Sequence, residues 1–156
     1  MDHRALMERA VALSFEGVRR KAGGPFGALI VREGEIVAEG WNCVTSVADP
    51  TAHAEVVAIR RACEALESHE LSGCVLYSSC EPCPMCLAAS YWARVDRIYF
   101  ANTRDDAARI GFDDRFFYDE LTRTTDQRQL ALTHLPVDDS LEPMRVWFDD
   151  AERTPY

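Results

Sequence analysis

The chain has 156 residues, of which 47% are hydrophobic and 28% are charged, and it carries a net charge of −9. This length is enough to bury a real core, so we expect a single domain over residues 1–156. No apolar run approaches the roughly 20 residues of a membrane span, and the N-terminus lacks a signal-peptide pattern, which predicts a cytoplasmic protein with no membrane partner. The acidic balance argues against a polyphosphate partner, and so favours a small molecule over nucleic acid.

Hydrophobic periodicity and turn residues predict helices and strands along most of the chain. In chain order these are a helix over the first twenty residues, strands at Phe26–Val31 and Glu35–Glu39, a helix from Thr51 to about Ser68, a strand at Cys74–Ser79, a helix at Cys83–Ala93 and a strand at Arg97–Ala101. The pattern then weakens to helical turns at Arg104–Ala108 and Phe116–Leu121, an edge strand at Gln129–His134 and a closing helix at Leu141–Ala151. The sum is a three-layer α/β/α fold with a mixed sheet of about five strands.

Two short motifs carry the chemistry, His53-Ala54-Glu55 and Pro82-Cys83-Pro84-Met85-Cys86. One imidazole and two thiolates form an accepted ligand set for a catalytic zinc, which leaves the fourth position to water. Cys83 and Cys86 lie three residues apart at a predicted helix start, where the helix N-terminus favours thiolates. Glu55 is not needed as a ligand, so it is free to move the proton of that water.

The spacing of His53 and Glu55 constrains where they can lie. On a regular helix, residues two apart point to opposite sides, so both reach one metal only from the first turn. Asp49 or Thr51 is the predicted cap of this helix, and Pro50 is able to open it.

A bare Cys-x-x-Cys is also compatible with a redox dithiol or with half of a structural zinc site. The upstream His-x-Glu completes the zinc deaminase signature H-x-E…P-C-x-x-C, and this chain carries every fixed position of it. A thioredoxin-like context and a fourth Cys or His at useful spacing are both missing, which disfavours the two alternatives. The other four cysteines are expected as reduced thiols in the core or near the site: Cys43, Cys63, Cys74 and Cys80.

The chain resembles the cytidine deaminase-like superfamily and, within it, is most similar to the small bacterial guanine deaminases. The segments that carry the resemblance are Gly24–Ala28, Gly40–Asn42, Asp49–Glu55, Ser79–Cys86, Tyr91–Arg94 and Gly111–Asp114, with a C-terminal tyrosine. The superfamily motifs are shared by deaminases of several substrates, and the later segments favour guanine. The resemblance implies zinc-dependent hydrolysis of guanine to xanthine and ammonia in purine catabolism, with one zinc per subunit and Glu55 as proton carrier.

The resemblance also assigns four residues to the bound base. Phe26 and Trp92 would form apolar walls for a flat ring, although aromatic residues at such places more often belong to a core. The backbone N–H of Ala54 would hold the base. Asn42 would bind the ring carbonyl and ring nitrogens through its amide, and the alternative for it is a turn asparagine after Gly40.

Asp114 is the residue that separates guanine from adenine. The reacting carbon of guanine carries an amino group beside a protonated ring nitrogen. A carboxylate can accept that proton-donating edge and help to move the proton, so Asp114 is a predicted catalytic residue together with Glu55. Asp113 competes for this role, and both aspartates are also compatible with a solvated turn. The resemblance further implies a swapped homodimer, in which the helix and tail at about 140–156 cross to a partner subunit and bring Tyr156 to its pocket.

Three alternatives remain open at this point. A tRNA adenosine deaminase would use the same chemistry but should have a basic face. Cytosine, or an aminotriazine such as ammeline, is another possible substrate for the same zinc site. A non-enzymatic zinc module would need neither Glu55 nor an open coordination position.

Overall fold

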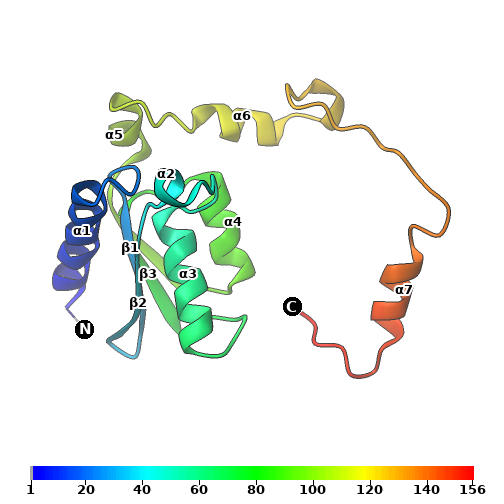
Figure 1. Cartoon of the computed structure of the whole chain (residues 1–156), viewed down its shortest axis with the longest axis horizontal. Helices are drawn as coiled ribbons and strands as arrows, with labels where there is room; N and C mark the ends of the chain where they lie inside the picture. The colour runs from blue at the N-terminus through cyan, green and yellow to red at the C-terminus, as the bar shows by residue number, and fades with distance from the viewer. Residues whose placement is uncertain (1) are drawn as a thin grey trace. The chain divides into compact units, whose positions relative to one another are not determined.

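The computed structural model describes residues 2–156. The chain divides into two units, of which the first ends at Arg115 and the second begins at Phe116. The first unit holds α1 (His3–Arg19), β1 (Gly27–Arg32), β2 (Glu35–Trp41), α2 (Val44–Val47), α3 (Ala54–Ala65), β3 (Cys74–Cys80), α4 (Pro84–Trp92), β4 (Arg97–Asn102) and α5 (Arg104–Arg109) (Figure 1). The predicted elements of this unit are all present, and the short helix α2 is an addition to them.

The four strands form one mixed sheet in the order β2-β1-β3-β4. β1 is antiparallel to both β2 and β3, whereas β3 and β4 are parallel. The prediction of a hairpin followed by a parallel strand–helix–strand unit is therefore confirmed. α4 connects β3 to β4, because two parallel neighbouring strands need a crossover connection and this is usually a helix. The end of β3 therefore leads directly to the start of α4.

The predicted fifth strand at Gln129–His134 is wrong, since this segment forms no ladder within residues 2–156. Its alternating Leu130 and Leu132 suggest a half-buried strand, but both leucines are exposed. The backbone N–H of Gln129 donates to the carboxylate of Glu120 at 2.8 Å instead of to a neighbouring strand. Alternation alone does not supply the partner that a strand needs.

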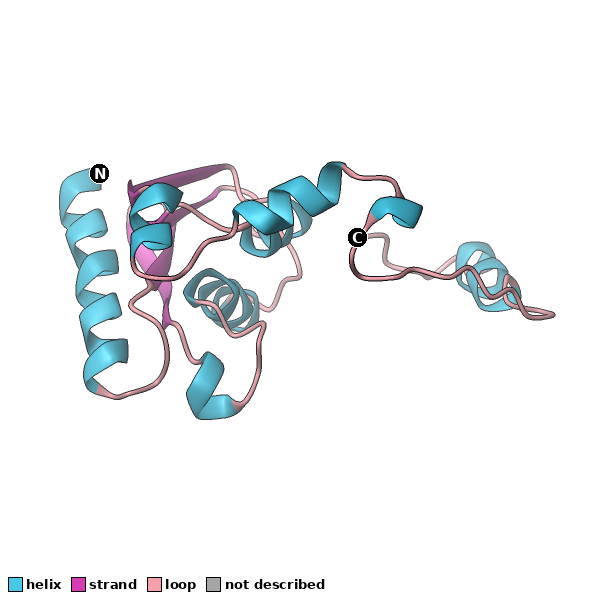
Figure 2. Ribbon diagram, turned by 90° about the horizontal axis from the view of Figure 1, so that it is seen from above, coloured by secondary structure: helices cyan, strands magenta, loops and turns pink. Residues whose placement is uncertain are grey.

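Helices cover both faces of the sheet, which confirms the three layers. Leu29 and Val31 of β1 pack with α1, while Ala28 and Ile30 of the same strand pack with α3. Figures 1 and 2 show α1 on one side of the strands and α3 with α4 on the other. Because β1 is buried on both faces, its sequence is a continuous apolar run.

The N-terminal end of α3 differs from the prediction in a way that matters for the site. The helix begins at Ala54 rather than at Thr51, and His53 is its N-cap with an extended backbone. The side chain of Asp49 accepts hydrogen bonds from the Thr51 N–H at 2.8 Å and the Thr51 hydroxyl at 2.6 Å. These bonds fix a turn before the helix, so the cap position passes to the histidine.

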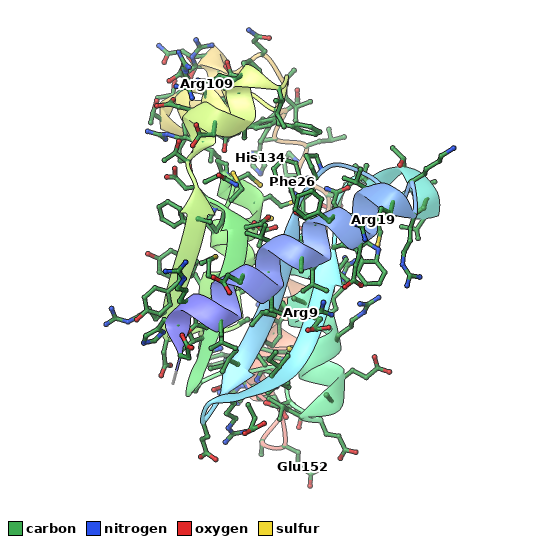
Figure 3. The ribbon with its side chains drawn as sticks, turned by 90° about the vertical axis from the view of Figure 1, so that its left-hand side faces the viewer. Arg9, Arg19, Phe26, Arg109, His134 and Glu152 are labelled. Carbon is green, nitrogen blue, oxygen red and sulfur yellow. The ribbon has the colours of Figure 1, made fainter. Side chains whose placement is uncertain are left out.

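An ion-pair network ties α1 to the edge strand β2. Arg9 of α1 donates from Nε and Nη2 to the two carboxylate oxygens of Glu39, at 2.6 and 2.7 Å, and from Nη1 to Glu16 at 2.6 Å. Figure 3 looks onto α1 lying across the sheet, with Arg9 labelled on it. Both carboxylates raise the pKa of the guanidinium, and the bidentate geometry fixes the direction in which the helix crosses the strands.

The boundary between the two units falls after the first residue of α6 (Arg115–Thr122). The second unit holds the rest of this helix, a 3₁₀ turn η1 (Thr125–Gln127) and α7 (Glu142–Asp149). Its one buried charged residue is Glu120, which accepts from Arg123 at 2.6 Å and from the Gln129 N–H. Its large apolar side chains are mostly exposed within the single chain. Between residues 2 and 156, none of the helices combines the length and the apolar character that crossing a membrane requires.

Candidate metal centre and active site

Two helix N-termini converge at the candidate metal centre. His53 caps α3 and Cys83 caps α4, and both have extended backbone angles, with φ −67° and ψ 155° for His53 and φ −65° and ψ 168° for Cys83. Pro84 opens α4, where its missing N–H costs nothing, and Cys86 lies in the first turn. The structure therefore brings the three predicted ligands together from two separate helices.

The spacing of the donor atoms fits one tetrahedral ion. Nδ1 of His53 lies 3.6 Å from Sγ of Cys83 and 3.5 Å from Sγ of Cys86, and all three donor atoms lie within 4.8 Å of one another. Zinc bonds of about 2.0 Å to nitrogen and 2.3 Å to sulfur, at a tetrahedral angle, place N and S about 3.5 Å apart. The site thus fits zinc through Nδ1 of the histidine, which leaves the proton on Nε2.

The thiols of Cys83 and Cys86 are hydrogen-bonded to each other, and their pKa values shift in opposite directions. Hydrogen bonding from Cys86 and then from His53 holds the pKa of Cys83 down at about 4, against the effect of burial. The same pairing and the burial of Cys86 raise the pKa of its thiol. The N-terminus of α4 also favours a thiolate at its cap. Zinc binds cysteine as the thiolate, so metal binding at this pair releases protons.

Glu55 lies beside this cluster and is almost completely buried, with 5% of its surface exposed. Its Oε1 accepts a hydrogen bond from the Ser78 hydroxyl at 3.0 Å, and its Oε2 lies 3.5 Å from Sγ of Cys86. Burial raises the pKa of this carboxyl, while the hydrogen bond from Ser78 acts in the opposite direction. A buried carboxylate against a ligand cluster has the environment of a general acid and base.

Asn42 is buried in the turn after β2, and its amide oxygen is already engaged. Oδ1 accepts from the Gly24 N–H at 3.1 Å and from the Val44 N–H at 3.2 Å. A side chain at Gly23 would begin 2.1 Å from this oxygen, so the close approach requires glycine there. Asn42 can therefore fill both of its predicted roles, the turn asparagine and the contact to the base. Its Oδ1 accepts the hydrogen bonds that fix the turn, and its Nδ2 would donate to the base.

Phe26 stands just before β1 (Figure 3), half-buried, and has an aromatic neighbour that the sequence did not indicate as a site residue. Its ring meets that of Phe112 edge to face, with centroids 4.9 Å apart. A Cβ at Gly24 would approach both rings at 3.0 Å, so this glycine makes room for the pair. The predicted wall at Phe26 thus has two rings, and the signal for the second was the Gly111–Asp114 segment itself.

The two neighbouring aspartates have different surroundings. Asp113 is exposed and its Oδ1 accepts from the Arg115 N–H at 3.0 Å, which occupies it at the start of α6. Asp114 is half-buried. Burial raises the pKa of Asp114, and the charge of Cys83 raises it further. Asp114 therefore lies within electrostatic reach of the ligand cluster, in the same unit.

The other residues predicted to contact the base lie in different parts of the chain: Ala54, Trp92 and Tyr156. Ala54 is the first residue of α3, where a backbone N–H has no acceptor within the helix. Trp92 ends α4, roughly 13 Å along the helix from Cys83, and is 67% exposed. It lines a surface pocket of about 390 Å³ with Ala88, Tyr91 and Arg94. Tyr156 belongs to the second unit, so the positions of Trp92 and Tyr156 at the base stay predictions.

The other cysteines behave as reduced thiols rather than ligands. All six cysteines are free. Cys80 is buried at the end of β3, and burial, with the charge of Glu55, raises its pKa to about 11. Its protonated Sγ donates to the Thr103 carbonyl at 3.5 Å. Cys80 is therefore a neutral neighbour of the site.

A His–Cys–Cys centre at two helix tips, with a buried carboxylate beside it, defines a hydrolytic zinc enzyme on an α/β/α scaffold. Comparison with known protein families agrees with this class. The chain belongs to the family described as the cytidine and deoxycytidylate deaminase zinc-binding region, whose model matches residues 1–102.

Individual relatives extend the match beyond that region. The guanine deaminase of Bacillus subtilis is 47% identical over 156 residues, which is the whole of both chains. Its X-ray structure has a TM-score of 0.96 and covers 100% of this chain and 99% of that one. A tRNA-specific adenosine deaminase of Aquifex aeolicus is 47% identical over 77 residues, 49% of this chain and 51% of the relative. A solved relative in complex with 8-azaguanine is 34% identical, with a TM-score of 0.68 over 70% of this chain and 63% of that one.

Proposed function

We propose that the protein is a zinc-dependent hydrolytic deaminase that converts guanine and water to xanthine and ammonia. The observation that carries this proposal is the 47% identity to a guanine deaminase along the entire chain, including residues 103–156 beyond the zinc-binding region. The tRNA adenosine deaminase matches about half of this chain. The shared chemistry resides in the first unit, and the match to the Bacillus subtilis guanine deaminase covers the rest of the chain as well.

The residues of the first unit can be given roles in the reaction. When bound to His53, Cys83 and Cys86, zinc would supply Lewis-acid activation of water near neutral pH. Oε2 of Glu55 would take a proton from the attacking water and deliver it to the exocyclic nitrogen of guanine, whose bond to carbon then breaks to release ammonia. Phe26 stacks beside the ring and keeps bulk water away from the reacting carbon.

Three polar groups would orient the base. The Ala54 N–H and Nδ2 of Asn42 would donate to the acceptors of the ring, because Oδ1 of Asn42 is already bonded to two backbone N–H groups. Asp114 would accept from the N–H edge beside the reacting carbon. Adenine presents no such edge there, and an unpaired, half-buried carboxylate would disfavour it.

The test is ammonia release from a panel of bases by the zinc-replete protein. Guanine, adenine, cytosine and ammeline are assayed beside adenosine in a tRNA anticodon stem-loop. Release chiefly from guanine, with xanthine formed, supports the proposal. Release chiefly from the RNA would favour the adenosine deaminase that the Aquifex relative represents, although the net charge of −9 disfavours RNA binding.

We further propose a homodimer in which the segment at about 140–156 reaches a partner subunit. The support is the apolar surface of the second unit, where side chains such as Met144, Val146, Trp147 and Phe148 of α7 are 46–67% exposed in the single chain. A surface of this kind needs a cover. One zinc per subunit, Tyr156 at the neighbouring pocket, a cytoplasmic location and a role in purine catabolism belong to the same proposal.

A further inference from the structure

Ser78 is a polar residue at a position where the strand pattern calls for an apolar one. Successive residues of β3 point to opposite faces of the sheet, and Cys74 and Leu76 join the apolar cluster on the α3 side. Ser78 follows in the same register and is 1% exposed. A buried hydroxyl is costly unless it has a hydrogen-bond partner, so the partner of this serine is informative.

That partner is the carboxylate of Glu55. The Ser78 hydroxyl donates to Oε1 at 3.0 Å, and this leaves Oε2 on the side of the ligand cluster, 3.5 Å from Sγ of Cys86. The two oxygens of one buried carboxylate therefore have different neighbours. One faces a strand inside the sheet, and the other faces the place where a metal would bind.

We infer that Ser78 is a positioning residue for the proton transfer of deamination, holding Oε1 of Glu55 so that Oε2 faces the reacting atoms. This inference rests on the proposed function. The same oxygen must first meet the proton of the attacking water and then the leaving nitrogen, so rotation of the carboxylate between these two moments would misplace it. A small misplacement of a reacting group can cost about 100-fold in rate.

Ser79 provides a comparison within the same strand. It is 2% exposed, and its hydroxyl accepts from the Gly27 N–H at 2.9 Å, on the other face of the sheet. Replacing either serine by alanine removes one buried hydroxyl from β3. The change at Ser78 loosens Glu55, whereas the change at Ser79 affects β1.

The kinetic test compares Ser78→Ala with Ser79→Ala in zinc-loaded protein. Ser78→Ala is expected to lower kcat for guanine by about 10- to 100-fold, with KM changed by less than about threefold and zinc content unchanged, because the serine does not touch the base. Ser79→Ala should leave kcat within about threefold, since its hydroxyl has no part in the transfer. Equal losses of kcat in both variants, or a loss confined to KM, would overturn the inference.

A second measurement does not depend on activity. In zinc-free protein, urea unfolding of Ser78→Ala, Glu55→Ala and the double variant forms a thermodynamic cycle. The shifts of the two single changes should not add, whereas Ser79→Ala and Glu55→Ala should be additive. Additivity in the Ser78 cycle would overturn the contact on which the inference depends. Coupling in that cycle without turnover of guanine by any of the proteins would instead contradict the proposed function.

Discussion

The carboxylate of Glu55 is buried between two polar groups, the hydroxyl of Ser78 on one side and the thiol of Cys86 on the other. His53, two residues earlier, is half-buried and presents Nδ1 to the same thiols. Residues two apart on a regular helix could not do this. They can do so here because His53 precedes the helix as its cap and Glu55 lies inside the first turn.

Substitutions at these two residues should have different effects on the metal. Glu55→Ala should keep zinc and lower kcat by at least about 100-fold, because a proton carrier is removed while all three ligands remain. His53→Ala should lose both zinc and turnover. Metal analysis of the purified variants beside a guanine assay measures both quantities. Loss of zinc from Glu55→Ala would show that the glutamate is a ligand.

Asp114 should show a conflict between activity and stability. Burial raises the pKa of its carboxyl above the ordinary value of 3.8, so the folded state holds the proton where the unfolded state has released it. The free energy of unfolding therefore falls as pH rises from the pKa of Asp114 in the unfolded chain to its higher pKa in the folded protein. Above the folded pKa, the full destabilisation by this carboxylate is present. Asp114→Asn should unfold at higher urea concentration than wild type at pH 7, and the difference should vanish at acid pH.

The same substitution should lower guanine turnover by at least about 100-fold, because the proposed role of the carboxylate is to take up and pass on a proton at the N–H edge, and a neutral amide can accept a hydrogen bond there but cannot take up the proton. Asp113→Asn is the matched control. That carboxylate is exposed and bonded to the Arg115 N–H, so guanine turnover should change little. Greater loss of turnover in Asp113→Asn than in Asp114→Asn would reverse the assignment of the two residues.

At the scale of elements, the position of α3 depends on how closely β2 approaches it. A Cβ at Gly40 would lie 2.6 Å from the Ala54 carbonyl oxygen and 2.8 Å from the Ala58 nitrogen, both backbone atoms that cannot move aside alone. Gly40 therefore holds the first turn of α3, which carries Glu55, against the edge strand.

Gly40→Ala should displace that turn. We expect a loss of about 1–3 kcal/mol in the free energy of unfolding, together with weaker zinc binding, from urea titration and competition with a chelator. Gly34→Asn is the control, because Gly34 has a φ of 93° with open space around it, a conformation that asparagine tolerates. Equal effects at the two glycines would mean that the contact with α3 is unimportant.

The elements also show what sequence reasoning could predict and what it could not. Buried strands and amphipathic helices were predicted because their periodicity reflects which face is covered, as for Leu29 and Ile30 of β1. The start of α3 was misplaced because the side chain of Asp49 bonds to Thr51 and forms a separate turn. The strand predicted at Gln129 is absent because pairing depends on a distant neighbour, and here Glu120 binds its N–H instead.

At the site, too, some residues were predicted from the sequence and others were not. His53, Cys83 and Cys86 were predicted from types and spacing, since few ligand sets satisfy zinc. Ser78 was missed because it is one residue in a buried run, and Phe112 because the Gly111–Asp114 segment alone does not show that it lies beside Phe26. Contacts between side chains far apart in the chain leave little trace in a single sequence.

At the scale of the whole molecule, the swapped homodimer makes a prediction about mixing. Glu55→Ala and Tyr156→Ala are each expected to be poorly active alone. If Tyr156 completes the partner's site, subunits exchanged between the two variants should form dimers with one complete site, and activity should exceed that of either variant. Native mass spectrometry resolves the mass difference between the two variants and so checks that mixed dimers form. A monomer with full activity, or no gain on mixing, would contradict the swap.

Whether the protein is a zinc-dependent guanine deaminase can be tested by adding zinc stepwise to metal-free protein and measuring the rate of xanthine formation from guanine after each addition. We expect no turnover before zinc is added, a linear rise of the rate with added zinc, and a break in this rise at one zinc per chain. Cys83→Ser should bind zinc more weakly and remain below the wild-type plateau. Full turnover of guanine by the metal-free protein, or a plateau reached without binding at His53, Cys83 and Cys86, would show that zinc at this site is not required for the reaction.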